Sequence, residues 1–349
     1  MEITALDCKD IRCLEGVEWS PSPGMNLIVG ANGAGKTSLL EGISLAGTGK
    51  TLRSGSVRAA IAHGRERLSA RLSFGEGLTA GKLRYERGTS ERIWVLDGAA
   101  VKSAAEVYER LPLMVFSPES HYAMLQDANA RREVVYWLMF HVEPFFLDTW
   151  RRYQRLLRQR NTALRVRDRN YRAFDPGLIQ VSAVLADMWQ RAALALEAPF
   201  AEVVAQQRLG GEAQLVLRPG WQGDSLAAAL EANRETDERL GYTLAGPHRA
   251  DVGFKLNGRP IQEVASHGQQ KILMSAWRLA VVMVVVAAGK RPVLLLDDLA
   301  AELDAERRAS FFGTLIDIGL QTFITAIDQA SFPSPATVFH VEHGCLRGP

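Results

Sequence analysis

Residues 30–37 have the sequence Gly-Ala-Asn-Gly-Ala-Gly-Lys-Thr, which fits the G-x-x-x-x-G-K-[ST] pattern of a phosphate-binding loop. They follow the apolar run Met25 to Val29 and precede an amphipathic stretch, so we expect a strand, a glycine-rich turn and a helix N-terminus. Such a turn wraps phosphates closely, and the N–H groups at the helix start favour negative charge. Lys36 would reach the β- and γ-phosphates of ATP, and the Thr37 hydroxyl would bind Mg²⁺. The predicted ATP-binding residues are Gly30, Ala31, Asn32, Gly33, Ala34, Gly35, Lys36 and Thr37.

Two acidic residues, Asp297 and Asp298, directly follow the apolar run Val293 to Leu296. A short run that is apolar at every position is typical of a parallel strand covered on both faces. Carboxylates at its C-terminal end would place Asp297 beside Mg²⁺, as a metal ligand with Thr37, and let Asp298 polarise the attacking water. Alone, this pattern also fits a solvated strand end. The phosphate-binding loop upstream favours the catalytic interpretation.

A third motif, Ser-His-Gly-Gln at residues 266–269, precedes an expected helix from about Gln269 to Ala288. Ser266 is a good N-cap residue for that helix. Together with the acidic pair and Ala-Glu-Leu-Asp at 301–304, the motif resembles the signature of ABC-type ATPases. The resemblance implies that Ser266, Gly268 and Gln269 contact ATP bound by a second subunit, in an ATP-dependent homodimer.

The branch of that family is indicated by the rest of the chain. The spacing between phosphate loop and signature implies a sizeable insertion, too short for the long coiled coil of SMC proteins. Several further segments resemble the RecF family, among them Phe-Ser-Pro-Glu at 116–119 and Gly-Pro-His-Arg-Ala-Asp at 246–251. The other matching segments are residues 26–33, 35–37, 40–43, 131–132, 157–161, 163–164, 266–269, 296–300 and 302–304.

Resemblance to the RecF family implies binding of double-stranded DNA near single-strand gaps, without sequence preference. It also implies loading of recombinase with the partners RecR and RecO, in DNA repair, replication restart and the SOS response to DNA damage. The chain departs from the family at His267, often Arg, and at Ala301, usually Ser. The switch-loop segment 323–328 contains no histidine, and Asp298 is shorter than a glutamate. We therefore expect a slow, DNA-stimulated ATPase that times a clamp.

We expect an α/β fold with two domains. Residues 1–120 and 240–349 would form a discontinuous ABC-type ATPase head, with a mixed sheet core and an antiparallel β part. Residues 121–239 would form an inserted, mainly helical arm. Strands are expected at 3–6, 17–19, 67–74, 82–87, 91–96, 113–116 and 213–217, a hairpin at 251–264, a helix break at 175–177 and one helix at 224–239.

The most charge-biased stretch, residues 151–172, holds nine arginines and one acidic residue. Arginine forks pair with backbone phosphates without reading bases, so this stretch is a candidate DNA contact. The alternative is a solvated helix face whose arginines pair with acids elsewhere, such as Glu231, Glu235, Asp237 and Glu238. Both interpretations stay open, as does a nucleotide or packing role for Lys50, Arg53 and Arg58. For His248 and Arg249 we favour a structural or nucleotide-proximal role over catalysis. The candidate DNA-binding residues are Arg151, Arg152, Arg155, Arg158 and Arg160.

The bulk composition, with 47% hydrophobic and 23% charged residues, is that of a soluble globular protein. The net charge of +2 is too small to indicate nucleic acid by itself, and no motif for sequence-specific DNA reading is present. The three cysteines form no CxxC pair, and the sequence shows no signal-peptide pattern and no apolar run long enough to span a bilayer. We therefore expect a cytoplasmic protein without a membrane partner. An ABC-type nuclease would need a further domain with metal-binding carboxylates. A transporter ATPase would have a compact helical insert, and the long insertion here argues against that class. An SMC-like architectural clamp without a mediator role remains the alternative.

Overall fold

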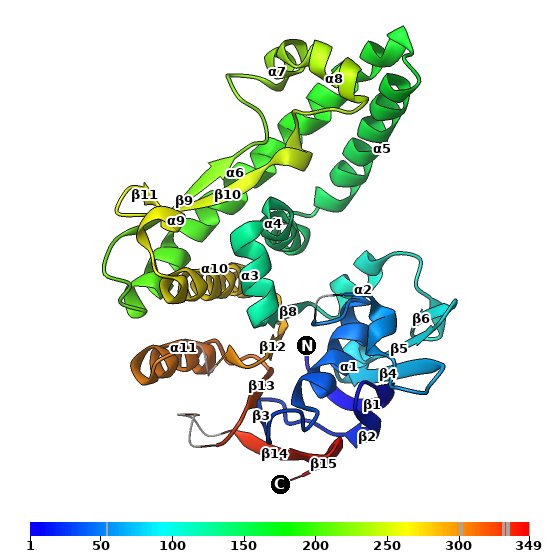
Figure 1. Cartoon of the computed structure of the whole chain (residues 1–349), viewed down its shortest axis with the longest axis vertical. Coiled ribbons are helices and arrows are strands. Elements are labelled where there is room, and N and C mark those ends of the chain that lie inside the picture. The colour runs from blue at the N-terminus through cyan, green and yellow to red at the C-terminus, as the bar shows by residue number, and fades with distance from the viewer. Residues whose placement is uncertain (54, 300–302, 330–331, 333–335, 349) are drawn as a thin grey trace. The chain divides into compact units, whose positions relative to one another are not determined.

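The computed structural model describes residues 1–53, 55–299, 303–329, 332 and 336–348, which divide into two compact units (Figure 1). The head is Met1–Tyr122 with Val285–Pro349, and the arm is Ala123–Val284. The expected end of the arm at residue 239 differs from this division, in which the arm continues to Val284. The reason is packing within the arm: residues after 239 supply a strand of the arm's sheet, and Phe254 lies edge-to-face on Trp277 with ring centroids 5.1 Å apart.

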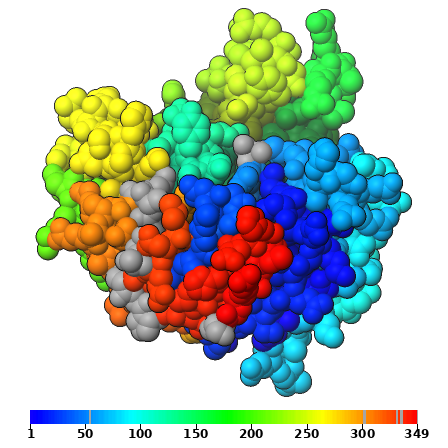
Figure 2. All heavy atoms as spheres, turned by 60° about the horizontal axis from the view of Figure 1, so that its bottom comes forward, coloured from blue at the N-terminus to red at the C-terminus, as the bar shows by residue number. Residues whose placement is uncertain are grey.

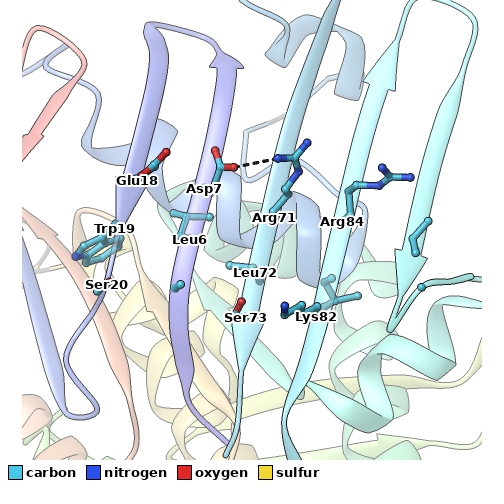
Figure 3. A pocket seen from close by; sticks show the side chains of 14 residues that line it. Leu6, Asp7, Glu18, Trp19, Ser20, Arg71, Leu72, Ser73, Lys82 and Arg84 are labelled. Carbon is cyan, nitrogen blue, oxygen red and sulfur yellow. Dashed lines mark hydrogen bonds and ion pairs between the residues drawn. The ribbon is translucent and has the colours of Figure 1, made fainter.

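The head contains an antiparallel sheet in the order β2-β1-β4-β5-β6-β7. Burial alternates along its strands, since every second residue of β4 is buried while its neighbours reach solvent. The first helix, α1, packs on this sheet. The opposite face is hollowed by a groove of about 680 Å³ in which Arg71 and Asp7 form an ion pair at 3.3 Å (Figure 3). The strands are β1 (Ile3–Ile11), β2 (Leu14–Trp19), β4 (Arg67–Phe74), β5 (Gly81–Gly88), β6 (Arg92–Leu96) and β7 (Ala99–Ala100); α1 is Lys36–Thr48.

A second head sheet has the order β15-β14-β3-β13-β12-β8, parallel except for β15. Strand β12 is buried at every position, as the apolar run before the acidic pair predicts, and β13 is buried at every position as well. The C-terminal strands lie beside the N-terminal ones, red against blue in Figure 2. The strands are β3 (Met25–Val29), β8 (Leu113–Phe116), β12 (Val293–Leu296), β13 (Thr322–Ala326), β14 (Thr337–Glu342) and β15 (Cys345–Arg347); the head's other helices are η1 (Val57–Ala60), η2 (Gly77–Thr79), α2 (Ala104–Arg110) and α11 (Ala305–Ile318).

The arm is mainly helical, with α5 and α6 packed side by side and a small sheet in the order β11-β10-β9 (Figure 1). Tyr136, Trp150 and Tyr153 belong to an aromatic cluster that joins α4 to α5. Helices α3 and α10 each cross a boundary between the units. The arm elements are α3 (Pro118–Gln126), α4 (Ala128–Val142), α5 (Phe146–Arg165), η3 (Arg169–Phe174), α6 (Asp175–Gln206), β9 (Ala213–Arg218), α7 (Leu226–Ala232), α8 (Arg234–Leu240), η4 (Pro247–Arg249), β10 (Asp251–Leu256), β11 (Arg259–Pro260), α9 (Ile261–Val264) and α10 (His267–Ala287).

Three arm elements differ from the sequence-based expectation. Residues 175–177 begin α6 instead of breaking a helix, because proline fits the first helical turn, where its missing N–H needs no partner. The single helix expected at 224–239 is two helices, α7 and α8, that meet at Asn233. The hairpin at 251–264 has a two-residue second strand, since Pro260 cannot donate to a longer ladder and α9 follows at once.

Helix α10 is long and apolar enough to cross a membrane by length and composition. Its most apolar window is 78% buried within the protein. A buried helix that is hydrophobic all round is typical of the core of a large protein. We therefore describe α10 as a core helix.

Candidate functional site

The phosphate-binding loop connects β3 to α1, as predicted. Gly33 and Gly35 have φ angles of +81° and +116°, a region that side chains with a Cβ rarely adopt. A Cβ at Gly30 would lie 2.3 Å from the carbonyl oxygen of Val341 on β14, so that position admits only glycine. The loop therefore holds its shape through backbone conformation and close packing against the parallel sheet.

Lys36 lies at the N-terminus of α1 and its ammonium group turns back onto the loop. Its Nζ donates hydrogen bonds to the carbonyl oxygens of Gly30 at 2.7 Å and Ala31 at 3.0 Å. Burial lowers the pKa of Lys36, which the nearby Asp298 and Asp297 partly oppose. A partly buried ammonium group at the start of a helix favours an anionic ligand.

Asp297 is the centre of a hydrogen-bond network at the carboxyl end of β12. The hydroxyls of Thr37 and Thr325 each donate to its Oδ1 at 2.9 Å. The same Thr325 oxygen accepts from the backbone N–H of Asp298 at 2.8 Å. Asp298 has a φ of +53°, and its side chain is exposed in the cleft. The structure thus brings together the loop threonine and both predicted carboxylates.

The oxygen atoms of Thr37 and Asp297 suit a magnesium ion. Mg²⁺ prefers oxygen ligands and usually combines one or two protein groups with substrate phosphates and water. Burial raises the pKa of Asp297, while the bonds from Thr325 and Thr37 oppose that rise. A carboxylate that is costly to bury without a cation fits this role. Among the described residues no cluster of three or more His, Cys, Asp or Glu forms another metal site.

These groups line one cleft of about 640 Å³ in the head. Arg12 forms part of its wall from the turn between β1 and β2, where its guanidinium is paired with Glu41. Glu119, at the start of α3, also lines the cleft and contributes to the raised pKa of Asp297. Arg53, for which a nucleotide role was left open, also lines the cleft. The lining residues that the sequence does not assign to the site are Arg12, Cys13, Ser38, Pro118, Glu119 and Thr325.

The signature motif lies in the arm, at the N-terminus of α10. Ser266 Oγ accepts from the backbone N–H of Gln269 at 3.2 Å, and Gln269 Oε1 accepts from the backbone N–H of Ser266 at 2.8 Å. This capping box confirms Ser266 as the helix cap. Gly268 is exposed, and a Cβ there would meet only Ser266 Oγ, at 3.9 Å. The role of these residues toward a second subunit stays a prediction. Of the residues after the acidic pair, Ala301 and Glu302 lie outside the described part of the chain.

Arg160 is wrongly predicted as a DNA contact. Its side chain is 1% exposed, with Nε 2.7 Å from Asp175 and Nη1 2.8 Å from Asp237. Nη1 also donates to Thr243 Oγ1 at 2.8 Å, and that hydroxyl donates to Asn161 at 2.7 Å. A guanidinium that is almost fully buried and already bonded to two carboxylates is not accessible to a DNA phosphate. The alternative interpretation, pairing with acids elsewhere in the chain, is correct for this arginine.

The other candidate arginines of α5 are exposed. Arg151 is 3.7 Å from Asp148, and Arg152 donates to Gln180 at 3.5 Å. Arg155 and Arg158 make no ion pair with any residue that the structure describes. These four remain candidates for DNA phosphates.

His248 has a structural position in the arm. Its Nδ1 accepts from the Tyr153 hydroxyl at 2.5 Å, and its Nε2 donates to the Thr243 carbonyl at 3.0 Å. Burial lowers the pKa of His248 to about 4, so the ring is neutral near pH 7. Arg249 stacks over the Tyr242 ring at 5.8 Å. Both residues therefore hold the turn after α8 against neighbouring side chains.

Comparisons with known proteins show the family to which the chain belongs. The family described as RecF/RecN/SMC N terminal domain matches residues 2–345 of the chain. A relative named DNA replication and repair protein RecF, from Thioalkalivibrio sulfidiphilus, is 37% identical over 362 residues, which cover 99% of each protein. The protein of that name from Pseudomonas aeruginosa (strain LESB58) is 35% identical over 361 residues, covering 99% of this chain and 97% of the relative.

Solved structures give the same fold. A structure described as the recombination mediator protein RecF-ATP in the RecFOR pathway is similar with a TM-score of 0.85 at 20% identity, covering 100% of this chain and 97% of that one. An SMC head bound to the C-winged helix domain of ScpA has a TM-score of 0.62 at 15% identity, covering 99% and 96%. The expected α/β fold with an ABC-type ATPase head is confirmed. The chain belongs to the RecF family of RecF/RecN/SMC proteins.

Proposed function

We propose that this chain is a RecF-like ATPase of DNA replication and repair that closes on double-stranded DNA when it binds ATP. In the cell it would act in the cytoplasm, near single-strand gaps, and help to load recombinase with RecR and RecO. Its relatives carry the name DNA replication and repair protein RecF, and a solved RecF of the same fold holds ATP. Hydrolysis would end the closed state and serve as a timer.

The Asp297 network is the observation that carries this proposal. Thr37 and Asp297 offer two converging oxygens, and Lys36 adds a partly buried positive charge in the same cleft. Mg²⁺ bound there would neutralise charge on the phosphates and orient them. Asp298 lies next to this position with its backbone fixed by Thr325, which suits a residue that orients and polarises water. Asp298→Asn should slow hydrolysis and prolong the ATP-bound dimer; unchanged turnover would remove Asp298 from this role.

Dimerisation is supported by the surroundings of Gly268. Glycine at an exposed position within a helix costs stability relative to alanine, by about 0.5–1 kcal/mol. Apart from its two neighbours and the backbone of its own helix, only Ser266 Oγ of the described chain lies within 4 Å of a Cβ placed there, so packing inside one subunit does not require glycine. A closely approaching second subunit would require it. The exposed Ser266 and Gly268 would then contact the nucleotide held by that subunit.

Gly268→Ala tests the proposal directly. The variant should be as thermally stable as the wild type or slightly more so, yet should stay monomeric in ATP and Mg²⁺ by multi-angle light scattering. Gly313→Ala is the matched control, because Gly313 lies within helix α11 and a Cβ there would also meet open space. The control should dimerise normally with ATP and not with ADP. A wild type that stays monomeric in saturating ATP would reject the dimer proposal.

An SMC-like architectural clamp without a mediator role is the second candidate, favoured by the similarity to an SMC head. Both candidates share the ATPase cycle, so hydrolysis rates do not separate them. Binding to purified RecR in the presence of ATP and gapped DNA does. A mediator should bind RecR under these conditions, whereas a stand-alone clamp should retain DNA and ignore RecR.

A further inference from the structure

The arm contains a cavity of about 570 Å³ between η3 and α8, which we name the η3–α8 pocket. Five arginines line it: Arg167, Arg169, Arg172, Arg234 and Arg239. Three acids line it as well, Asp168, Glu235 and Glu238. The arginines come from two segments that are far apart in the sequence and meet here through the packing of α5, η3 and α8.

Two of the five arginines are already paired within the arm. Glu231 binds Arg172 at 3.0 Å and Arg234 at 3.2 Å. Glu238 accepts a hydrogen bond from the Tyr171 hydroxyl at 2.7 Å and lies 3.8 Å from Arg234. Glu231 and Glu238 are thus already paired with side chains of the arm.

The other three arginines are available to a ligand. Arg167, Arg169 and Arg239 are exposed, and none forms an ion pair with any residue in the described part of the arm. Of the remaining acids, Asp168 caps η3 by accepting from the backbone N–H of Asn170 at 2.9 Å. Glu235 forms no hydrogen bond or ion pair with the part of the arm that the structure describes. The pocket thus has three uncommitted guanidinium groups against one uncommitted carboxylate.

The base of the pocket is packed against buried side chains of the arm. Tyr171 is 5% exposed, and the guanidinium of the buried Arg160 lies 5.2 Å from the centre of its ring. Arg167 follows the end of α5 with a φ of +57°, and its N–H donates to the Leu164 carbonyl at 3.1 Å. Glycine is the usual residue at this helix-ending position, so an arginine there costs backbone strain. A strained residue held by its surroundings is typical of functional sites.

We infer that the η3–α8 pocket binds a phosphate group of the DNA backbone. The inference rests on the proposed binding of DNA and adds a contact that is separate from the exposed arginines of α5. Guanidinium forks match phosphate oxygens, and a cavity of this size admits part of the backbone but no base-reading element. The contact is therefore independent of sequence and sensitive to salt.

The test replaces the three free arginines together, as Arg167→Gln, Arg169→Gln and Arg239→Gln. Anisotropy with labelled duplex DNA and ATP should show affinity lowered about tenfold or more, and a plot of log affinity against log salt flattened by about one unit or more. A second set, Arg65→Gln, Arg67→Gln and Arg84→Gln, removes the same charge from exposed head arginines that have acidic partners. That set should leave the slope within error of the wild type.

Two further variants sharpen the outcome. Glu235→Gln removes the free carboxylate and should raise DNA affinity about twofold or more at low salt, because less negative charge faces the phosphate. Lysine at the three arginine positions keeps the charge and should restore most of the slope, and thermal unfolding checks that each variant is folded.

Three outcomes would contradict the inference. If the wild type binds DNA and the triple glutamine variant has the same salt slope, the assignment of the pocket is overturned and the proposed function is not. If the triple glutamine variant binds DNA as the wild type does but no longer binds a polyglutamate peptide that the wild type binds, the assignment of the pocket to DNA is also overturned. The pocket would then bind an acidic protein partner. A wild type that binds no DNA rejects the proposed function and the pocket together.

Discussion

Thr325 shows how one hydroxyl can organise a nucleotide site. It donates to the Asp297 carboxylate and accepts from the Asp298 backbone, so it fixes the predicted metal ligand and the predicted water-orienting residue at once. Thr325→Val keeps the shape and removes both bonds. We expect about a 10- to 100-fold loss in the Mg²⁺-dependent rate of ATP hydrolysis, as for other outer-shell partners of metal ligands. Thr325→Ser should retain most of the rate; equal loss in both variants would indicate a packing role.

Arg160 is expected to determine the stability of the arm. Arg160→Met leaves Asp237 buried without its cation, and the cost of breaking such a pair is about 3–5 kcal/mol. Arg158→Met, two residues earlier on the exposed face of α5, should change the free energy of unfolding by less than about 0.5 kcal/mol. Urea unfolding followed by circular dichroism measures both. Similar values for the two variants would contradict the structural assignment of Arg160.

The local motifs of this site could be predicted from sequence because each carries its own pattern. Residues 30–37 and the Asp297–Asp298 pair are recognisable within a few positions, and the structure brings them together. Thr325 and Arg12 could not be found that way, since they reach the cleft from other strands and turns. Arg160 was misassigned because its partner Asp237 lies far along the chain. A charge-biased stretch gives no indication of which arginines face inward.

At the scale of elements, the turn at η4 depends on a neutral histidine. The pKa of His248 is about 4 in the folded arm, below its usual value of about 6.5, because the ring is buried. As the pH falls, this histidine is therefore protonated in the unfolded chain at a higher pH than in the folded arm. The free energy of unfolding should fall as the pH drops from about 6.5 to about 4, by an amount on the order of 3 kcal/mol. His248→Gln should reduce this loss, whereas His63→Gln, at an exposed position in the head, should not. Equal pH dependence in wild type and His248→Gln would contradict the assignment.

The head strands could be predicted more closely than the arm helices. Strands β3, β4 and β8 begin and end at the expected residues, because burial on a sheet gives either a short apolar run, as in β3 and β8, or a regular alternation, as in β4. In the arm, Pro176 proved to start a helix, and Asn233 separates two helices in what had looked like one. Proline and asparagine occur both where a helix begins and where a helix ends. Which of the two forms depends on packing against distant residues, which the local sequence does not show.

At the scale of the whole molecule, ATP binding should protect both units of the chain in a dimer. Hydrogen exchange with ATP and Mg²⁺ should slow at residues 30–41 and 293–298, which surround the nucleotide cleft. It should also slow at residues 266–270, because a second subunit would cover the signature. In Gly268→Ala only the first two segments should slow. Equal protection of 266–270 in that variant would show that ATP acts on the signature within one subunit.

The strand order of the parallel sheet also has a consequence for protein synthesis. When a ribosome has made the chain as far as residue 284, the arm is complete, but the head has only β3 and β8 of this sheet. These two strands are not neighbours: β13 and β12 lie between them, and β14 closes the other side of β3. Domains generally fold as units during synthesis. The arm is therefore expected to fold first, and the phosphate-binding loop to acquire its shape only when the last strands emerge.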